Sequence, residues 1–158
     1  MPRAYVARAF VALGSNLGDR ERTLLDAVEE LRAAPGVEVA AVSGLIETEP
    51  VGFVDQPRFV NGVVALDTTL PARALLELLL DVERRFGRNR EGVPAQGPRT
   101  LDLDLLLYGD AEIDEPGLQV PHPRLHERPF VLGPLAELAP GLEIPGRGTV
   151  QALIARLH

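Results

Sequence analysis

The 158-residue sequence contains no cysteine, no lysine and no tryptophan. Without cysteine there is no disulfide bond and no thiolate metal site, and a reducing compartment is permitted. Without lysine, both a P-loop lysine and a Schiff-base mechanism are excluded, because each needs a lysine amine. Arginine supplies all 16 basic residues, so any binding site for an anion must be built from arginine.

Long apolar runs and a positive net charge are also absent. Charged residues, glycine or proline interrupt every apolar run well short of the ~20 residues that a membrane-spanning helix needs, and the N-terminus lacks the apolar stretch of a signal peptide. The net charge of −7 argues against nucleic-acid binding, because nonspecific affinity for nucleic acid depends on a cationic surface. We therefore expect a cytoplasmic protein that binds neither membranes nor nucleic acid. We also expect a monomer, although neither charge nor composition determines the oligomeric state. Its length fits one domain over residues 1–158.

The order of the predicted elements indicates the class of fold. Apolar runs rich in β-formers predict strands at 4–13, 37–47, 59–68 and 100–108, and leucine stripes predict helices at 19–34 and 71–86. This β-α-β-β-α-β order is that of a ferredoxin-like α+β fold, an antiparallel sheet with both helices on one face. Two further helices, over 130–139 and 150–157, form a C-terminal helical extension. The other sheet face is expected to be covered by loops or left open.

Two carboxylates lie inside an apolar run in the segment GPRTLDLDLLL, residues 97–107. In a strand Asp102 and Asp104 share one face, with Cα atoms about 6.5 Å apart, and leucines take the other face. Both carboxylates then reach a common divalent cation or cation pair. The alternative is an ordinary solvated strand face. An arginine-rich loop directly before the strand favours a phosphate and metal site suited to phosphoryl transfer; its arginines are Arg88, Arg90 and Arg99.

Residues 97–104, GPRTLDLD, resemble the signature of the 6-hydroxymethyl-7,8-dihydropterin pyrophosphokinase family. Five more motifs agree with that family in order and spacing: ALGSNLG (12–18), ETEPVG (47–52), DQPRFVN (55–61), VPHPR (120–124) and RPF (128–130). The resemblance runs from about residue 4 to about residue 145. It implies a folate-biosynthesis enzyme that transfers pyrophosphate from ATP to the hydroxymethyl group of the dihydropterin and releases AMP.

The resemblance also implies residues for the metal and for ATP. Asp102 and Asp104 are implied to hold two Mg²⁺ ions that bridge the ATP phosphates and the pterin hydroxyl. Three arginines are implied as catalytic residues around the triphosphate, namely Arg88, Arg90 and Arg99. The positions implied to contact ATP are Glu83, Arg99, Leu105, His122 and Arg128. As alternatives, Glu83 pairs with a neighbouring arginine on its helix, and His122 is a turn histidine between two prolines.

For the pterin, the resemblance implies stacking between Phe59 and Phe130, with Asn61 and the backbone near Thr48 and Val51 reading the polar edge. A flat heterocycle with an amide-like edge needs aromatic faces and a side chain that both donates and accepts, which Phe and Asn supply. The alternative is that both phenylalanines are ordinary core residues. The sequence also departs from some family members, since Ala95-Gln96 stands where they carry an Arg-Trp pair.

Two other classes of function remain open on this fold. A non-catalytic module that binds a small molecule is one, because a fold alone does not decide function. Such a module has no use for adjacent carboxylates beside an arginine-rich loop. An RNA-binding domain is the other, and it needs exposed aromatic residues and a basic face. Aromatic residues make up only 4% of the chain, and its charge is acidic, so the sequence favours the kinase.

Overall fold

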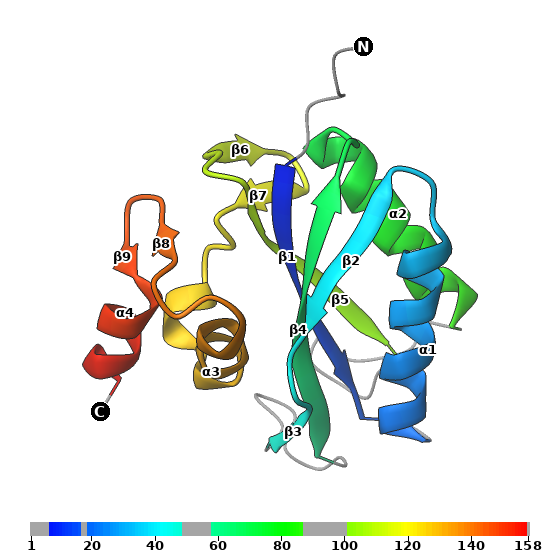
Figure 1. Cartoon of the computed structure of the whole chain (residues 1–158), viewed down its shortest axis with the longest axis horizontal. Coiled ribbons are helices and arrows are strands. Elements are labelled where there is room, and N and C mark those ends of the chain that lie inside the picture. Colours follow the sequence, from blue (N-terminus) through cyan, green and yellow to red (C-terminus); the bar gives the residue numbers. More distant parts are fainter. Residues whose placement is uncertain (1–6, 17–18, 49–57, 87–100, 158) are drawn as a thin grey trace.

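The computed structural model describes residues 7–16, 19–48, 58–86 and 101–157. Its main sheet has five strands, β1 (Ala7–Ser15), β2 (Val37–Val42), β3 (Ile46–Thr48), β4 (Phe59–Thr68) and β5 (Asp102–Tyr108). The order is β2-β4-β1-β5, β3 lies beside β4, and all pairs are antiparallel. With α1 (Arg20–Ala33) and α2 (Ala72–Arg85), the chain has the predicted ferredoxin-like arrangement, which is confirmed (Figure 1).

Both of these helices pack on one face of the sheet (Figure 1). Helix α1 begins where the Asp19 carboxylate accepts the Arg22 N–H at 3.3 Å, a side-chain N-cap that satisfies an otherwise unpaired donor. The buried stripes that hold the two helices are those of the sequence pattern, Leu24, Ala27, Val28 and Leu31 on α1 and Leu75, Leu79 and Val82 on α2. Leu103 and Leu105 of β5 join this core, so the two aspartates of β5 face the opposite side.

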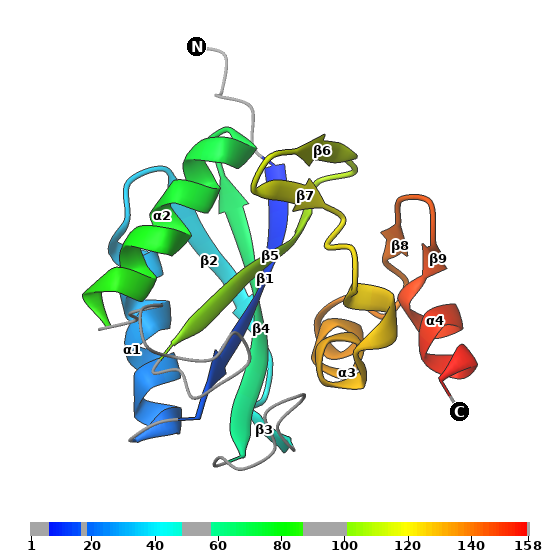
Figure 2. The same ribbon diagram turned by 180° about the vertical axis from the view of Figure 1, so that it is seen from behind.

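The opposite face of the sheet is covered in part by a helix. Helix α3 (Pro129–Leu138) lies across it, and α4 (Val150–Arg156) packs on the outer side of α3 (Figures 1 and 2). Leu132 and Leu135 of α3 meet Val63 of β4 and Leu106 of β5 in a second apolar core. The expectation that only loops cover this face is therefore wrong for the area under α3, and the aspartates lie beside that area.

A β-bulge lets one strand serve both cores. The β1–β5 register pairs Val11 with Leu105 but Phe10 with Leu107, so β5 has one additional residue at this point. Leu105 consequently belongs to the core under α1 and α2, whereas Leu106 and Leu107 both belong to the core under α3. The bulge explains why the Asp–Leu alternation gives way to three consecutive leucines.

The strand predicted at 37–47 is broken, and β2 ends at Val42. The Ser43 Oγ accepts the Val63 N–H at 2.8 Å, and the Ser43 N–H donates to the Val63 carbonyl at 2.9 Å. The next amide, of Gly44, donates at 2.9 Å to the carboxylate of Glu137 on α3. The chain thus leaves the ladder to meet α3 before it re-enters the sheet as β3. A sequence pattern does not contain this long-range contact.

Three small elements were not predicted. They are a hairpin of β6 (Ile113–Glu115) and β7 (Leu118–Val120), a 3₁₀ turn η1 (Leu125–Glu127), and a hairpin of β8 (Glu143–Ile144) and β9 (Gly148–Thr149). Arg73 of α2 anchors the first hairpin, because it donates to the Glu115 carboxylate at 2.9 Å and to the Pro116 carbonyl at 3.0 Å. Within the described ranges, every helix is too short or too polar to cross a bilayer.

Candidate functional site

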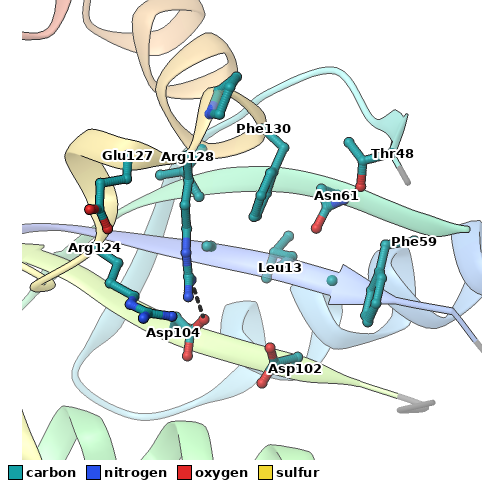
Figure 3. A pocket seen from close by; sticks show the side chains of 14 residues that line it. Leu13, Thr48, Phe59, Asn61, Asp102, Asp104, Arg124, Glu127, Arg128 and Phe130 are labelled. Carbon is teal, nitrogen blue, oxygen red and sulfur yellow. Dashed lines mark hydrogen bonds and ion pairs between the residues drawn. The ribbon is translucent and has the colours of Figure 1, made fainter. Parts of the chain in front are cut away.

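A cavity of about 430 Å³ opens on the sheet face next to α3 (Figure 3). Strands β1, β3, β4 and β5 form one side of it, and the segment that enters α3 forms the other. Seven residues predicted from the sequence line it, namely Thr48, Phe59, Asn61, Asp102, Asp104, Arg128 and Phe130. The structure therefore brings together side chains that are up to 82 positions apart in the chain, from Thr48 to Phe130.

Small residues on the central strand make room for the cavity. In the sheet register Gly14 of β1 lies between Asn61 of β4 and Asp102 of β5, and Ala12 lies beside Asp104. A Cβ atom on Gly14 would come within 3.1 Å of the Asn61 Oδ1 atom, which is closer than side chains normally approach. The space above β1 is thus open because β1 carries almost no side chain there. The amide of Asn61 and the carboxylate of Asp102 flank the same floor.

Two aromatic rings stand at the cavity wall. In Figure 3, Phe59 and Phe130 lie on either side of Asn61. Asn61 is buried, and its Nδ2 donates to the Thr48 Oγ1 at 2.5 Å, which fixes the orientation of the amide. Aromatic faces with a fixed amide between them suit a flat heterocycle that both donates and accepts hydrogen bonds.

Carboxylates and guanidinium groups share the other end of the cavity. The Arg128 Nη1 lies 3.8 Å from the Asp104 Oδ2, and the Arg128 guanidinium lies 5.8 Å from the centre of the Phe130 ring. Arg124 lines the same region (Figure 3). About a third of the Asp104 side chain is exposed to solvent. Such a partly solvated ion pair is weak, so Arg128 can exchange Asp104 for another anion at little cost.

The carboxylate pair fits a magnesium ion that arrives with a nucleotide. In the described ranges, no group of three or more His, Asp or Glu side chains is placed to hold a metal ion. Asp102 and Asp104 alone offer oxygen ligands from one strand face. Mg²⁺ typically takes one or two protein carboxylates and fills its remaining positions with water and phosphate oxygens. The two carboxylates therefore fit the protein's share of a Mg²⁺ coordination sphere.

His122 lies outside the cavity lining but close to its charged end. The His122 Nδ1 accepts the Arg124 N–H at 3.1 Å, so the Nε2 atom carries the proton in the neutral ring. Burial, with help from Arg128 and Arg124 and against the pull of Asp102, lowers the pKa of His122 to about 4. At neutral pH the ring is uncharged and offers an N–H donor.

Two residues that were predicted to contact ATP are in the core beneath the site. Glu83 is 3% exposed, and its Oε2 accepts the Leu103 N–H at 2.7 Å, midway between the two aspartates. Leu105 is 6% exposed and packs among the residues under α1 and α2. Neither lines the cavity, and their roles toward ATP stay predictions. Four predicted site residues lie outside the described residues, namely Val51, Arg88, Arg90 and Arg99.

The sequence patterns assigned no site role to seven residues that line the cavity, namely Ala12, Leu13, Gly14, Arg124, Glu127, Pro129 and Val131. Ala12, Gly14 and Arg124 belong to motifs quoted above, yet a motif does not reveal which residue faces a cavity. The strand register identifies Ala12 and Gly14, because it places them between β4 and β5. Glu127 is the last residue of η1, an element that the sequence pattern did not predict.

The comparisons with known proteins agree with one another. The family model described as 7,8-dihydro-6-hydroxymethylpterin-pyrophosphokinase matches residues 10–140. Three bacterial relatives carry the name 2-amino-4-hydroxy-6-hydroxymethyldihydropteridine pyrophosphokinase. The protein of Methylorubrum extorquens is 45% identical over 96% of this chain and 94% of its own length. The protein of Pseudomonas aeruginosa is 45% identical over 95% of this chain and 91% of its own length. The protein of Bacillus subtilis is 48% identical over 85% of this chain and 80% of its own length.

Solved structures show the same fold. The wild-type HPPK-DHPS of Plasmodium falciparum with pterin and p-hydroxybenzoate matches 96% of this chain with a TM-score of 0.69 and 15% identity. The same protein with pteroate matches 99% of this chain, also with a TM-score of 0.69 and 15% identity. The chain spans less than half of those longer proteins, 42% and 43%.

Proposed function

Since the chain belongs to the 7,8-dihydro-6-hydroxymethylpterin-pyrophosphokinase family, we propose that its cavity between β1, β4, β5 and α3 is the site of pyrophosphoryl transfer. The chain is an ATP-dependent pyrophosphokinase of folate biosynthesis, with ATP and the hydroxymethyl dihydropterin as substrates. The proposal concerns which residues bind each substrate and the metal. We also propose that residues 1–158 form one domain and that the protein is a monomer in the cytoplasm.

One observation carries the assignment of residues: the row Asn61, Gly14 and Asp102 across three neighbouring strands. Asn61 lies between the two phenylalanines, whereas Asp102 belongs to the carboxylate pair. Adjacent strands are about 4.8 Å apart, so the two ends of the row are separated by about 10 Å. A pterin ring against Asn61 therefore directs its hydroxymethyl group toward the aspartates.

Magnesium, when it is bound with ATP, supplies positive charge that neutralises the phosphate oxygens as charge develops on them. Asp102 and Asp104 would hold the metal at the end of the cavity. Arg128 and Arg124 provide guanidinium donors for phosphate, and the family resemblance assigns Arg88, Arg90 and Arg99 to the same task. His122, neutral and protonated on Nε2, donates to an oxygen of the nucleotide.

In the transfer itself, the pterin hydroxyl oxygen forms a bond to the β-phosphorus of ATP. The bond between the β-phosphorus and the bridging oxygen to the α-phosphate breaks, AMP leaves with that bridging oxygen, and the hydroxyl proton passes to solvent. Phe59, Phe130 and Asn61 contribute by fixing the ring, so that the attacking oxygen is aligned before the reaction. Alignment and electrostatic stabilisation account for most of the catalysis in such reactions.

Replacement of the aspartates tests this assignment. We expect Asp102→Asn and Asp104→Asn each to slow AMP formation from Mg-ATP and the dihydropterin by about 10²- to 10⁴-fold, because each loses a charged metal ligand. Asp110→Asn is the control, since Asp110 lies in the exposed turn after β5 and not in the cavity. Wild-type rates in both aspartate variants, or ADP in place of AMP as the product, contradict the proposal.

A further inference from the structure

The strand that carries Thr48 has little apolar packing to hold it. In the described part of the chain, β3 is three residues long and pairs with β4 alone, with Thr48 opposite Phe59. Ile46 is 41% exposed, and Glu47 is exposed as well. Yet the Thr48 hydroxyl receives the Asn61 amide, so the position of β3 decides how Asn61 is oriented. Besides its ladder with β4, the contacts of β3 in the described residues are therefore mainly polar.

Arg20, at the first turn of α1, supplies one of these polar contacts from the back of the sheet. Side chains alternate along β3 and β4, so Thr48, Phe59 and Asn61 face the cavity while Glu47 and Val60 face α1. The Arg20 Nη1 donates to the Arg58 carbonyl at 2.6 Å. The Arg20 Nη2 lies 3.5 Å from the Glu47 Oε2, and the Arg58 Nη1 lies 3.3 Å from the Glu47 Oε1, so Arg20 reinforces a direct ion pair between the two segments.

Each partner of Arg20 directly precedes a residue of the cavity. Arg58 is followed by Phe59, and Glu47 is followed by Thr48. A guanidinium is a planar, rigid fork of donors, so one arginine that engages both partners fixes the distance between the two chain segments. A hydrogen bond from a charged donor to a carbonyl is also stronger than a neutral one. The Arg20 side chain is 29% exposed and that of Glu47 is 48% exposed, so the hydrogen bond to the Arg58 carbonyl is the stronger of the two contacts and the ion pair with Glu47 is the weaker.

We propose that Arg20 is a positioning residue for the pterin. It does not touch the substrate; it holds the main chain at Arg58 and Glu47 so that Phe59 and the Thr48–Asn61 pair are aligned before the ring arrives. This inference rests on the proposed assignment of the cavity to the pterin. Preorganisation lowers the free-energy cost of binding, so the loss of Arg20 weakens pterin binding selectively. The aspartates lie on β5, which β1 separates from β4, and ATP binding stays unchanged.

Arg20→Met tests the inference, because methionine keeps an unbranched stem and removes every donor. We expect the pterin Kd and KM to rise about three- to tenfold, whereas kcat and the KM for ATP stay within about twofold of wild type. Arg20→Lys keeps one charged donor group, so its pterin Kd is expected to lie between those of the wild type and Arg20→Met. Arg22→Met is the matched control: it lies in the same turn of α1, and its guanidinium is 3.2 Å from Asp26 of its own helix. It should behave as wild type.

Wild-type pterin affinity in Arg20→Met overturns the positioning role, and so does an equal loss of affinity for both substrates. Asn61→Ala separates this failure from failure of the proposed function. If Asn61→Ala weakens pterin binding and Arg20→Met does not, only the role of Arg20 is wrong; if neither does, the cavity is not the pterin site. Should Arg20→Met not fold, Glu47→Gln is compared with Arg58→Met. Arg58→Met removes the Arg58–Glu47 ion pair and keeps the carbonyl that Arg20 binds, whereas Glu47→Gln also weakens the contact with Arg20, so Glu47→Gln must raise the pterin Kd more than Arg58→Met does.

Discussion

The cavity exists because two residues on the central strand β1 have little or no side chain. Gly14 and Ala12 leave the floor between β4 and β5 open, and the polar groups of Asn61 and Asp102 border it. Gly14 is required here for space. A methyl group at this position meets the Asn61 amide first, at 3.1 Å. The absence of a side chain at Gly14 is therefore a condition for the cavity to exist in this form.

Gly14→Ala is expected to raise the pterin Kd, because the new methyl group displaces the Asn61 amide from its bond to Thr48. Titration calorimetry with the pterin measures the effect. Gly133→Ala is the control, since a Cβ there meets nothing within 4 Å in the exposed part of α3. That control should keep pterin affinity and gain about 0.5–1 kcal/mol in stability from helix propensity. Equal pterin affinity in both variants contradicts the account.

The titration of His122 predicts a dependence of stability on pH. The pKa of His122 is about 4 in the folded protein, below the ordinary value of 6.5, chiefly because the ring is buried. Between pH 6.5 and 4 the unfolded chain binds this proton and the folded chain does not, so the free energy of unfolding falls as the pH falls through that window. Above pH 6.5 the ring is neutral in both states, and its contribution is constant.

Urea unfolding of wild type and His122→Gln at pH 7, 6 and 5 measures this contribution. The wild type should lose more stability between pH 7 and pH 5 than the variant, because glutamine does not titrate. Nuclear magnetic resonance of the imidazole gives the pKa directly. Parallel pH profiles for the two proteins, or a measured pKa near 6.5, refute this explanation.

Strand β5 connects the two aspartates of the cavity to both apolar cores. Its first part alternates Asp102, Leu103 and Asp104 between the cavity and the core under α1 and α2. After the bulge, Leu106 and Leu107 enter the core under α3. Arg128 is the N-cap of helix α3 and Phe130 lies in its first turn, and both side chains line the cavity. The bulge therefore places one wall of the site relative to the other.

Leu106→Ala tests that connection. Leu106 is fully buried, so truncation should cost about 2–5 kcal/mol of unfolding free energy through lost burial and the cavity that remains. Leu25→Ala on α1 is the control, because Leu25 is 50% exposed and should change stability little. Hydrogen exchange of the α3 amides should accelerate in Leu106→Ala and not in Leu25→Ala. An unchanged α3 would show that Leu106 does not hold it.

Local patterns predicted most elements, and long-range contacts account for the failures. The spacing of Leu24, Ala27, Val28 and Leu31 predicted α1, and Asp19 marked its start correctly. The prediction of one continuous strand over 37–47 was wrong, because the chain leaves the sheet at Ser43. That break depends on contacts with Val63 and Glu137, which are distant in sequence. The cover that α3 gives the sheet was missed for the same reason. Seven cavity residues could be predicted because they lie in recognisable sequence motifs. The place of Gly14 on the cavity floor became evident only from the strand register.

At the scale of the whole molecule, two apolar cores share one sheet. Phe10 and Val11 are neighbours on β1, yet Phe10 packs under α3 and Val11 packs under α1 and α2. Loss of either core exposes the sheet that the other requires, so the two are coupled. This arrangement supports the proposal of a single domain over the whole chain.

Unfolding should therefore be one cooperative transition. Far-ultraviolet circular dichroism and hydrogen exchange of the α3 amides should report the same midpoint, and the calorimetric and van't Hoff enthalpies should be equal. Two separate transitions, with α3 and α4 melting before the sheet, contradict a single cooperative unit.

Asp102 and Asp104 are proposed to hold divalent cations together with the nucleotide. Electron paramagnetic resonance of Mn²⁺, titrated in the presence of a non-hydrolysable ATP analogue and the pterin, tests this proposal without requiring turnover. The wild type should bind two Mn²⁺ ions per chain, and Asp102→Asn and Asp104→Asn should each lower the number or the affinity of the bound ions, whereas Asp110→Asn should not. Wild-type Mn²⁺ binding in both cavity variants would contradict the account.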